Sequence, residues 1–235
     1  MDRALLAWGL RSRRNTTRSM AGVLTRRHND RLSPRHDAVT GQTAPPLPKP
    51  WMPNPRLPRL WLFTDHRRLP DPRAAVAALP PARAGVVLRH DCDPARATLG
   101  RDLARICCLR RLVLVVAGDP RLAASLGAGV HLRAGRWPGV LRPRGMVTSS
   151  AHGVADMRRA VRAGADLVFL SPAFRTASHP GAPGLGPLRW GLMARRLPLF
   201  TKARLAALGG VDGDSVRRLP AGRCHAAGAI TALFP

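Results

Sequence analysis

Residues 85–132 read GVVLRHDCDPARATLGRDLARICCLRRLVLVVAGDPRLAASLGAGVHL, and they give the first indication of the fold class. Three short apolar runs, at 85–89, 112–116 and 129–132, alternate with two segments rich in Ala, Arg and Leu. Short apolar runs bounded by turn residues are typical of strands buried on both faces, and intervening helices are typical of parallel sheets. The stretch therefore predicts strand–helix–strand–helix–strand.

The same alternation continues on both sides of this stretch, from Leu60 onward. The predicted strands are 60–64, 85–89, 112–116, 129–132, 146–150, 167–170, 205–208 and 224–227. The predicted helices are 72–79, 94–109, 120–126, 154–163, 188–196 and 213–219. Eight such strands with helical crossovers predict a compact (β/α)₈ TIM barrel, shorter than the usual length of about 250 residues.

Two connections explain the short length. Residues 133–145 contain several Gly and Pro and are predicted to form no full helix. Only 230–235 follow the eighth strand, so the last helix is expected to be missing or reduced to a turn. A doubly wound open sheet is the competing architecture, but the expected glycine-rich loop after an early strand is not present, because Gly127–Gly129 precedes a strand.

Three Asp-Pro pairs mark helix starts. Asp71, Asp93 and Asp119 each precede a proline at the start of a predicted helix. Because aspartate is favoured at the N-cap and proline at the first helical position, we expect each of these three carboxylates to cap its helix.

The composition is strongly basic, and the choice of residue types reflects GC-rich codons in the gene. The 235-residue chain has 39 Lys and Arg against 13 Asp and a formal charge of +26, while its 45% apolar content excludes a wholly disordered chain. It has no Glu and only two Lys, as expected from GC-rich codons. Because arginines are spread along the chain and only 4% of residues are aromatic, nucleic acid is not the expected partner.

Residues 1–58 differ from the rest of the chain, which forms the predicted barrel domain, 59–235. They are basic and contain a proline-rich run at 44–53, which predicts a flexible, disordered extension. A transit peptide and a later true start, at Met20 or Met52, are the alternatives. No segment has the length of apolar sequence that a membrane span needs, and the cysteines lack paired spacing, so we expect a cytoplasmic protein.

Polar residues gather where the predicted strands end, which is where barrels place their active sites. Several of these segments resemble, in order and spacing, thiamine phosphate synthases and the related TenI family over about residues 60–231. The segments are 62–65, 88–89, 127–132, 150–152, 170–176, 180–186 and 207–211.

The resemblance implies an enzyme of thiamine biosynthesis that joins hydroxymethylpyrimidine pyrophosphate to a thiazole phosphate, with Mg²⁺ and release of pyrophosphate. Its substrates would be small and phosphorylated, and a homodimer is expected. Metal and cationic groups would stabilise the charge that develops on the leaving group. The residues implied are Arg89, Ser150 and the metal ligand Asp119 on the pyrophosphate side, Thr176 and Ser178 in the sixth loop, and Gly209 and Gly210 at the thiazole phosphate.

The chain departs from the family pattern at six positions. On the pyrophosphate side, the family glutamine and lysine are replaced by Val87 and Asp91, and the asparagine before the metal aspartate is replaced by Gly118. The second metal-binding aspartate falls near Arg136. The lysine of the sixth loop is replaced by His179, and the serine of the phosphate site by Gly228. We retain His179 and Gly228 as candidate substrate-binding residues. One hypothesis is that Asp91 or Asp93 becomes the second Mg²⁺ ligand while Arg136 supplies the lost cation.

A second function stays open. His152 matches the position of a catalytic histidine in TenI proteins, and structural and catalytic roles are equally compatible with it. A thiazole phosphate tautomerase, or a barrel that only binds a phosphorylated ligand, is therefore the alternative to a synthase. A basic protein that associates with nucleic acid through residues 1–58 is the other class.

Overall fold

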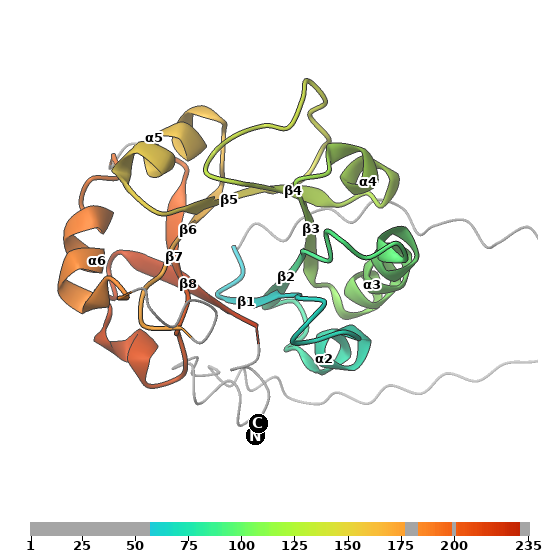
Figure 1. Cartoon of the computed structure of the whole chain (residues 1–235), viewed down its shortest axis with the longest axis horizontal. Helices are drawn as coiled ribbons and strands as arrows, with labels where there is room; N and C mark the ends of the chain where they lie inside the picture. Colours follow the sequence, from blue (N-terminus) through green and yellow to red (C-terminus); the bar gives the residue numbers. More distant parts are fainter. Residues whose placement is uncertain (1–56, 177–182, 199–200, 231–235) are drawn as a thin grey trace, which may run out of the picture.

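The computed structural model describes residues 57–176, 183–198 and 201–230. Eight parallel strands follow one another around a closed barrel, and the last pairs with the first (Figure 1). The strands are β1 (Leu60–Phe63), β2 (Ala84–Leu88), β3 (Val113–Ala117), β4 (Gly129–Leu132), β5 (Val147–Ala151), β6 (Leu167–Leu170), β7 (Arg204–Leu208) and β8 (Cys224–Ala229). The predicted TIM barrel is confirmed, and the open sheet is excluded.

Helices lie outside the ring of strands (Figure 1). They are α2 (Arg73–Ala78), α3 (Arg96–Arg110), α4 (Pro120–Ser125), α5 (Val154–Arg162), α6 (Gly186–Ala194) and the 3₁₀ turn η1 (Ser215–Arg218). Residues 133–146 between β4 and β5, all of them described, form no helix, as predicted. The predicted helix at 213–219 is wrong, because this connection holds only the short 3₁₀ turn.

Alternation along the strands divides the core into an inner and an outer part. Trp61, Phe63 and Phe169 point inward and meet edge to face, with ring centroids 5.6 Å apart for Trp61–Phe169 and 4.8 Å apart for Phe63–Phe169. Their neighbours Leu60 and Leu62 pack outward with residues of the helices. The aromatic rings therefore fill the barrel, and the helices cover its outer face.

A glycine in β2 makes this aromatic interior possible. A Cβ atom at Gly85 would lie 2.5 Å from two ring carbons of Trp61, which is closer than atoms can pack. Trp61 in turn donates through its indole N–H to the carbonyl of Pro58, 3.0 Å away. The small residue in one strand thus accommodates the large residue in the next.

The predicted Asp-Pro caps are confirmed at one helix and wrong at two. Asp119 is the N-cap of α4, and its Oδ1 accepts from the N–H of Leu122 at 2.9 Å. Pro72 and Ala95 are the N-caps of α2 and α3 instead. Asp71 and Asp93 accept the N–H two residues further on, so each carboxylate closes a turn ahead of its helix.

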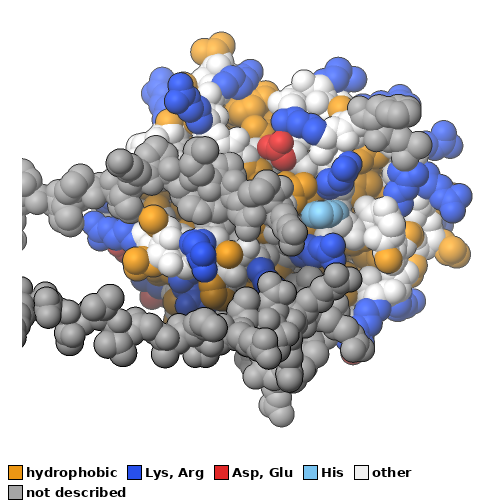
Figure 2. Space-filling view, turned by 180° about the vertical axis from the view of Figure 1, so that it is seen from behind, with side chains coloured by type: hydrophobic (Ala, Val, Ile, Leu, Met, Phe, Trp, Pro, Cys, Tyr) orange, Lys and Arg blue, Asp and Glu red, His pale blue; other side chains and the backbone are white. Residues whose placement is uncertain are grey.

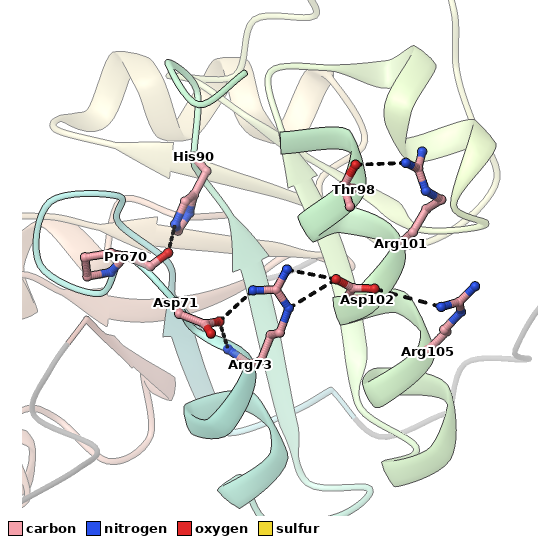
Figure 3. A network of polar contacts seen from close by, with 8 residues as sticks. All are labelled: Pro70, Asp71, Arg73, His90, Thr98, Arg101, Asp102 and Arg105. Carbon is pink, nitrogen blue, oxygen red and sulfur yellow. Dashed lines mark hydrogen bonds and ion pairs between the residues drawn. The ribbon is translucent and has the colours of Figure 1, made fainter. Parts of the chain in front are cut away.

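Helices α2 and α3 are tied together on the outside of the barrel. Arg73 in α2 donates from Nε and Nη2 to Asp102 Oδ2 in α3, at 3.1 and 2.8 Å, and also contacts Asp71 (Figure 3). Asp102 also faces Arg105 at 3.9 Å. A forked pair of this kind sets the orientation of one helix on the other.

Two expectations lie outside the described residues. The basic extension falls almost entirely on residues 1–56, and the missing last helix falls on 231–235. Within the described residues, no helix is both long and apolar enough to cross a membrane.

Candidate active site

A cavity of about 960 Å³ opens at the carboxyl ends of the strands. The predicted site residues that line it are Arg89, Asp91, Ser150, His152, Thr176, Gly209, Gly210 and Gly228. Asp119 is not among its lining residues, and Ser178 and His179 lie outside the described residues. The barrel thus brings eight of the eleven predicted residues to one cavity.

The lining of the cavity is basic. It includes four arginines, Arg68, Arg89, Arg133 and Arg175, against the two carboxylates of Asp65 and Asp91. Lys and Arg side chains also far outnumber Asp side chains on the face of the molecule displayed in Figure 2. A cavity with this balance of charge attracts anionic ligands such as phosphates.

The carboxyl end of β2 is fixed by a chain of hydrogen bonds that the sequence did not reveal. The backbone N–H of Arg89 donates to Thr64 Oγ1 at 2.9 Å, and Thr64 Oγ1 lies 2.9 Å from His90 Nδ1. His90 Nε2 lies 3.2 Å from the carbonyl oxygen of Pro70, as Figure 3 shows. Since a carbonyl only accepts, the proton is on Nε2, and Nδ1 accepts from the threonine hydroxyl. The buried pair Thr64–His90 therefore sets where Arg89 enters the cavity.

Asp65, which follows β1, keeps its negative charge at this end of the cavity. Burial alone would raise the pKa of its carboxyl group, but the N–H groups of Arg68 and Arg67 and the charge of Arg89 lower the pKa. Its Oδ1 accepts from those two N–H groups at 3.1 and 3.0 Å. The carboxylate closes the turn after β1.

Arg133, which follows β4, extends past the end of β3 to the end of β2. Its Nη2 lies 2.5 Å from Asp91 Oδ2 at the end of β2. The side chain passes over Gly118, whose φ is +66°, and a Cβ atom there would lie 3.4 Å from Arg133 Nε. That distance is an ordinary van der Waals contact, so the positive φ, rather than lack of space for a Cβ atom, favours glycine at this position.

A second guanidinium lies beneath this pair. Arg96, the first residue of α3, donates from Nη2 to the carbonyl of Ala117 at 2.6 Å and lies 3.2 Å from Asp91 Oδ1. Its Nη1 is 3.9 Å from Asp119 Oδ2. We call three lining residues, Arg89, Asp91 and Arg133, the arginine edge of the cavity, and we include with them Arg96, which contacts Asp91 but is not among the lining residues.

These residues do not fit a magnesium ion. Mg²⁺ binds oxygen ligands at about 2.0–2.1 Å, through one or two carboxylates together with water and substrate phosphate. Both oxygens of Asp91 face guanidinium groups, and Oδ1 of Asp119 caps α4. In the described part of the chain, no three Asp, His or Cys side chains come together as a metal site. A metal at this edge would have to displace two arginines.

The residues proposed to compensate for the lost family ligands lie elsewhere. Asp93 accepts from the N–H of Ala95, at 2.8 Å, and Arg136 is not among the lining residues. The backbone of Arg136 donates to the carbonyl of Arg133 at 3.0 Å. Arg133 is therefore the arginine of this loop that lines the cavity, and the sequence analysis did not single it out.

Ser150 in β5 combines a structural contact with a place in the lining. Its Oγ accepts from the N–H of Ala134 at 3.2 Å, while the neighbouring Ser149 Oγ accepts from Gly135 at 2.9 Å and donates to the Ser150 carbonyl. The two hydroxyls hold the start of the β4–β5 connection against the barrel mouth. This contact also fixes the backbone next to Arg133.

His152 follows β5 and has a defined tautomer. Its Nδ1 lies 3.1 Å from the carbonyl oxygen of Ser171, and its backbone N–H donates to Asp156 Oδ2 at 2.9 Å. Because the carbonyl only accepts, Nδ1 carries a proton, which in the neutral ring leaves the lone pair on Nε2. The imidazole is therefore suited to accept a proton from a ligand.

His131 forms part of the floor of the cavity. Its Nδ1 lies 2.8 Å from Thr148 Oγ1, and its ring meets Phe63 edge to face at 5.5 Å. Burial, with the charges of Arg89 and Arg133, lowers the pKa of His131 to about 3. The ring is therefore neutral at physiological pH.

Three glycines form the opposite side of the cavity, and we call Gly209, Gly210 and Gly228 the glycine edge. Gly209 and Gly210 follow β7 with φ of +87° and +62°. A Cβ atom at Gly210 would lie 2.1 Å from the carbonyl oxygen of Arg175, so only glycine fits. A Cβ atom at Gly228 would lie 2.7 Å from the Phe63 ring. This edge brings backbone, rather than side chains, to the cavity.

Comparisons with known proteins agree with this architecture. Residues 63–233 match the family model described as thiamine monophosphate synthase. The chain is 34% identical over 178 residues to a thiamine-phosphate synthase of Halorhodospira halophila, covering 70% of this chain and 82% of that protein. It is 33% identical over 95 residues to a putative thiamine-phosphate synthase 2 of Aquifex aeolicus, covering 38% and 48%.

A solved structure has the same fold. Thiamine phosphate pyrophosphorylase from Pyrococcus furiosus superposes with a TM-score of 0.58 and 21% identity, covering 73% of this chain and 85% of that chain. At this identity the likeness concerns the barrel alone.

Proposed function

Because the chain belongs to the thiamine monophosphate synthase family, we propose that it joins hydroxymethylpyrimidine pyrophosphate to a thiazole phosphate. In this transfer the C–O bond to pyrophosphate breaks, and pyrophosphate leaves with the electron pair. The thiazole nitrogen supplies its lone pair for the new bond to the pyrimidine methylene carbon. The enzyme must therefore hold two anions and stabilise the one that leaves.

The observation that supports this reaction is a single cavity with two different edges for anions. The arginine edge lies at β2–β4 and the glycine edge at β7–β8, on opposite sides of the closed barrel. Between them the floor is apolar and aromatic, with Phe63 and neutral His131. A volume of about 960 Å³ is at the upper end of the range for small-molecule sites and is compatible with two substrates side by side.

Each edge has a proposed part in the transfer. Arg89 donates to the pyrophosphate, and Ser150 adds a hydroxyl contact on the same side. Gly209, Gly210 and Gly228 let the thiazole phosphate approach the backbone closely. Thr176 in the loop after β6, together with Ser178 and His179, is expected to contact the substrates.

The test is synthesis by the full chain supplied with both substrates. We expect thiamine phosphate and pyrophosphate to appear in equal amounts, and Arg89→Ala to reduce both. Binding of each substrate without any product, in a folded sample, would contradict the proposed transfer.

The geometry of His152 supports a second candidate, a thiazole phosphate tautomerase. In the neutral ring, Nε2 would remove a proton from one position of the thiazole ring system, and the imidazolium would return it at another. The test is isomerisation of a thiazole phosphate without the pyrimidine substrate. Loss of isomerisation in His152→Gln, with thiazole phosphate still bound, would support this candidate, whereas no isomerisation by the unmodified chain would exclude it.

We also propose a cytoplasmic homodimer. The exposed leucines Leu188 and Leu192, 83% and 63% exposed and four residues apart on α6, support an apolar contact between copies. Size-exclusion chromatography with light scattering would detect it. Leu192→Glu is expected to shift the chain toward monomer, and a monomeric unmodified chain would contradict the dimer.

A further inference from the structure

The arginine edge holds a guanidinium where a divalent cation would have to bind between the carboxylates of Asp91 and Asp119. Arg96 lies 3.2 Å from Asp91 and 3.9 Å from Asp119, and its side chain is only 15% exposed. Its Nε is buried without a partner among the described residues, so this nitrogen is shielded from water. A partly buried cation of this kind is stabilised by the two carboxylates and repels any other cation that approaches them.

Arg133 completes the replacement on the side of the cavity. It is 63% exposed, lines the cavity and contacts the other oxygen of Asp91 at 2.5 Å. That contact uses Nη2, whereas a guanidinium has five N–H donors in a fixed plane. The same side chain can therefore be held by Asp91 and donate to a phosphate oxygen at once.

Gly118 shows that the surroundings accommodate this arginine. An added Cβ atom would lie 3.4–3.6 Å from Nε, Nη2 and Cζ of Arg133, which is ordinary van der Waals contact, so the guanidinium leaves room here for no more than a methyl group. Any longer side chain at this position would compete with Arg133 for the same space. The arginine, the glycine and Asp91 thus form one matched arrangement across β2, β3 and β4.

We propose that this cavity binds the diphosphate group of its substrate without a divalent cation, with Arg133 and Arg89 supplying the positive charge. Arg96 neutralises Asp91 and Asp119 from below, so the carboxylates do not repel the diphosphate. This inference rests on the proposed function, because it concerns how the same diphosphate substrate is held. It assigns to Arg133 a binding role that the family resemblance did not imply.

The experiment is calorimetric titration of the full chain with inorganic pyrophosphate, in EDTA and in excess MgCl₂. We expect pyrophosphate to bind in EDTA and to bind no more tightly in MgCl₂. Binding that requires Mg²⁺ overturns the inference and leaves the proposed function standing. No binding of pyrophosphate under either condition overturns both.

Variants of two arginines in one loop make the assignment specific. Loss of a charge-assisted hydrogen bond predicts that Arg133→Ala binds pyrophosphate about 10- to 100-fold more weakly than the unmodified chain in EDTA. The affinity of Arg133→Lys should lie between those of the unmodified chain and Arg133→Ala. Arg136→Ala removes the same charge three residues away, outside the cavity lining, and is expected to bind like the unmodified chain. Thermal unfolding checks that each variant is folded. Unchanged binding by Arg133→Ala, or equal losses in Arg133→Ala and Arg136→Ala, overturns the inference.

Discussion

The arginine edge and the glycine edge of the cavity are built in opposite ways. The arginine edge uses long side chains whose positions depend on ion pairs between β2, β4 and α3. The glycine edge uses backbone in left-handed conformations, packed against the loop after β6. Substitutions should therefore act mainly on ligand binding at the first edge and on the fold itself at the second.

The largest effect is expected at the glycine edge. Gly210→Val forces a branched side chain into a residue with φ of +62° and places its Cβ 2.1 Å from the Arg175 carbonyl oxygen. Backbone strain and overpacking together predict a loss of about 3–5 kcal/mol in the free energy of unfolding. Urea denaturation measures this loss.

The matched control is Gly222→Val, because a Cβ atom at Gly222 meets nothing within 4 Å and its φ is not positive. That variant is expected to stay close to the unmodified chain. Equal stability of the two variants would show that the backbone at the glycine edge adapts more easily than its geometry indicates.

The next effect is expected at the arginine edge, and it should leave the fold intact. Arg89→Ala removes a charged donor from the cavity, which predicts about 100-fold lower kcat/KM for synthesis with little change in the free energy of unfolding. Binding of thiazole phosphate at the other edge should persist. Steady-state kinetics and a separate binding titration measure the two.

Arg121→Ala is the matched control for Arg89→Ala, because Arg121 is exposed on α4 and is not among the lining residues. Its loss of one positive charge should leave kcat/KM almost unchanged. A comparable fall in both variants would mean that the net charge of the chain, rather than the edge, attracts the substrate.

A smaller effect is expected at Gly228, where the family residue is a serine. A Cβ atom would lie 2.7 Å from the Phe63 ring and 3.2 Å from Leu208 Cδ1, so Gly228→Ser overpacks the floor. We expect a loss of about 1–3 kcal/mol in the free energy of unfolding. In a Phe63→Leu background the added cost of the serine should shrink.

A double-mutant cycle measured by urea denaturation gives the coupling between the two positions. Additive losses in the free energy of unfolding would show that contact with Phe63 is not what requires a glycine at position 228. Strong coupling would show that this departure from the family pattern is matched by a change in packing.

Much of the fold follows from local sequence. Strands β4 and β6 have the predicted bounds, and the others differ by at most two residues at either end, because buried apolar runs between turn residues have one dominant interpretation. The secondary structure of 213–219 was predicted wrongly, because its charged and apolar residues are compatible with a helix but form one 3₁₀ turn. Asp71 and Asp93 show the same limit, because aspartate closes turns as readily as it caps helices.

The candidate site was predictable only in part, for a physical reason. Arg89, Gly209 and Gly210 were singled out by the family resemblance, and they lie at strand ends, which the barrel topology brings together. Arg96 and Arg133 were missed because their roles depend on the direction of long side chains and on the space above Gly118. In a chain with 39 Lys and Arg residues, sequence gives no signal for which arginine reaches a given carboxylate.

A pH-dependent effect, small for each unit of pH, is expected at the floor between the two edges. His131 has a pKa of about 3 in the folded chain, below the usual value of 6.5, because it is buried and lies near Arg89 and Arg133. Above pH 6.5 the ring is neutral in both states and contributes nothing to the pH dependence. Between pH 6.5 and 3 only the unfolded chain binds the proton, so the free energy of unfolding falls by about 1.4 kcal/mol for each unit of acidification.

His131→Gln removes this titration while leaving a group able to bond to Thr148. Urea denaturation at several pH values from 7 to 4 should therefore show a shallower acid slope in the variant than in the unmodified chain. The arginines of the arginine edge should not contribute to the difference, because arginine stays charged throughout this range. Parallel slopes would mean that the floor admits enough water to let His131 protonate in the folded chain, and the apolar separation of the two edges would then be incomplete.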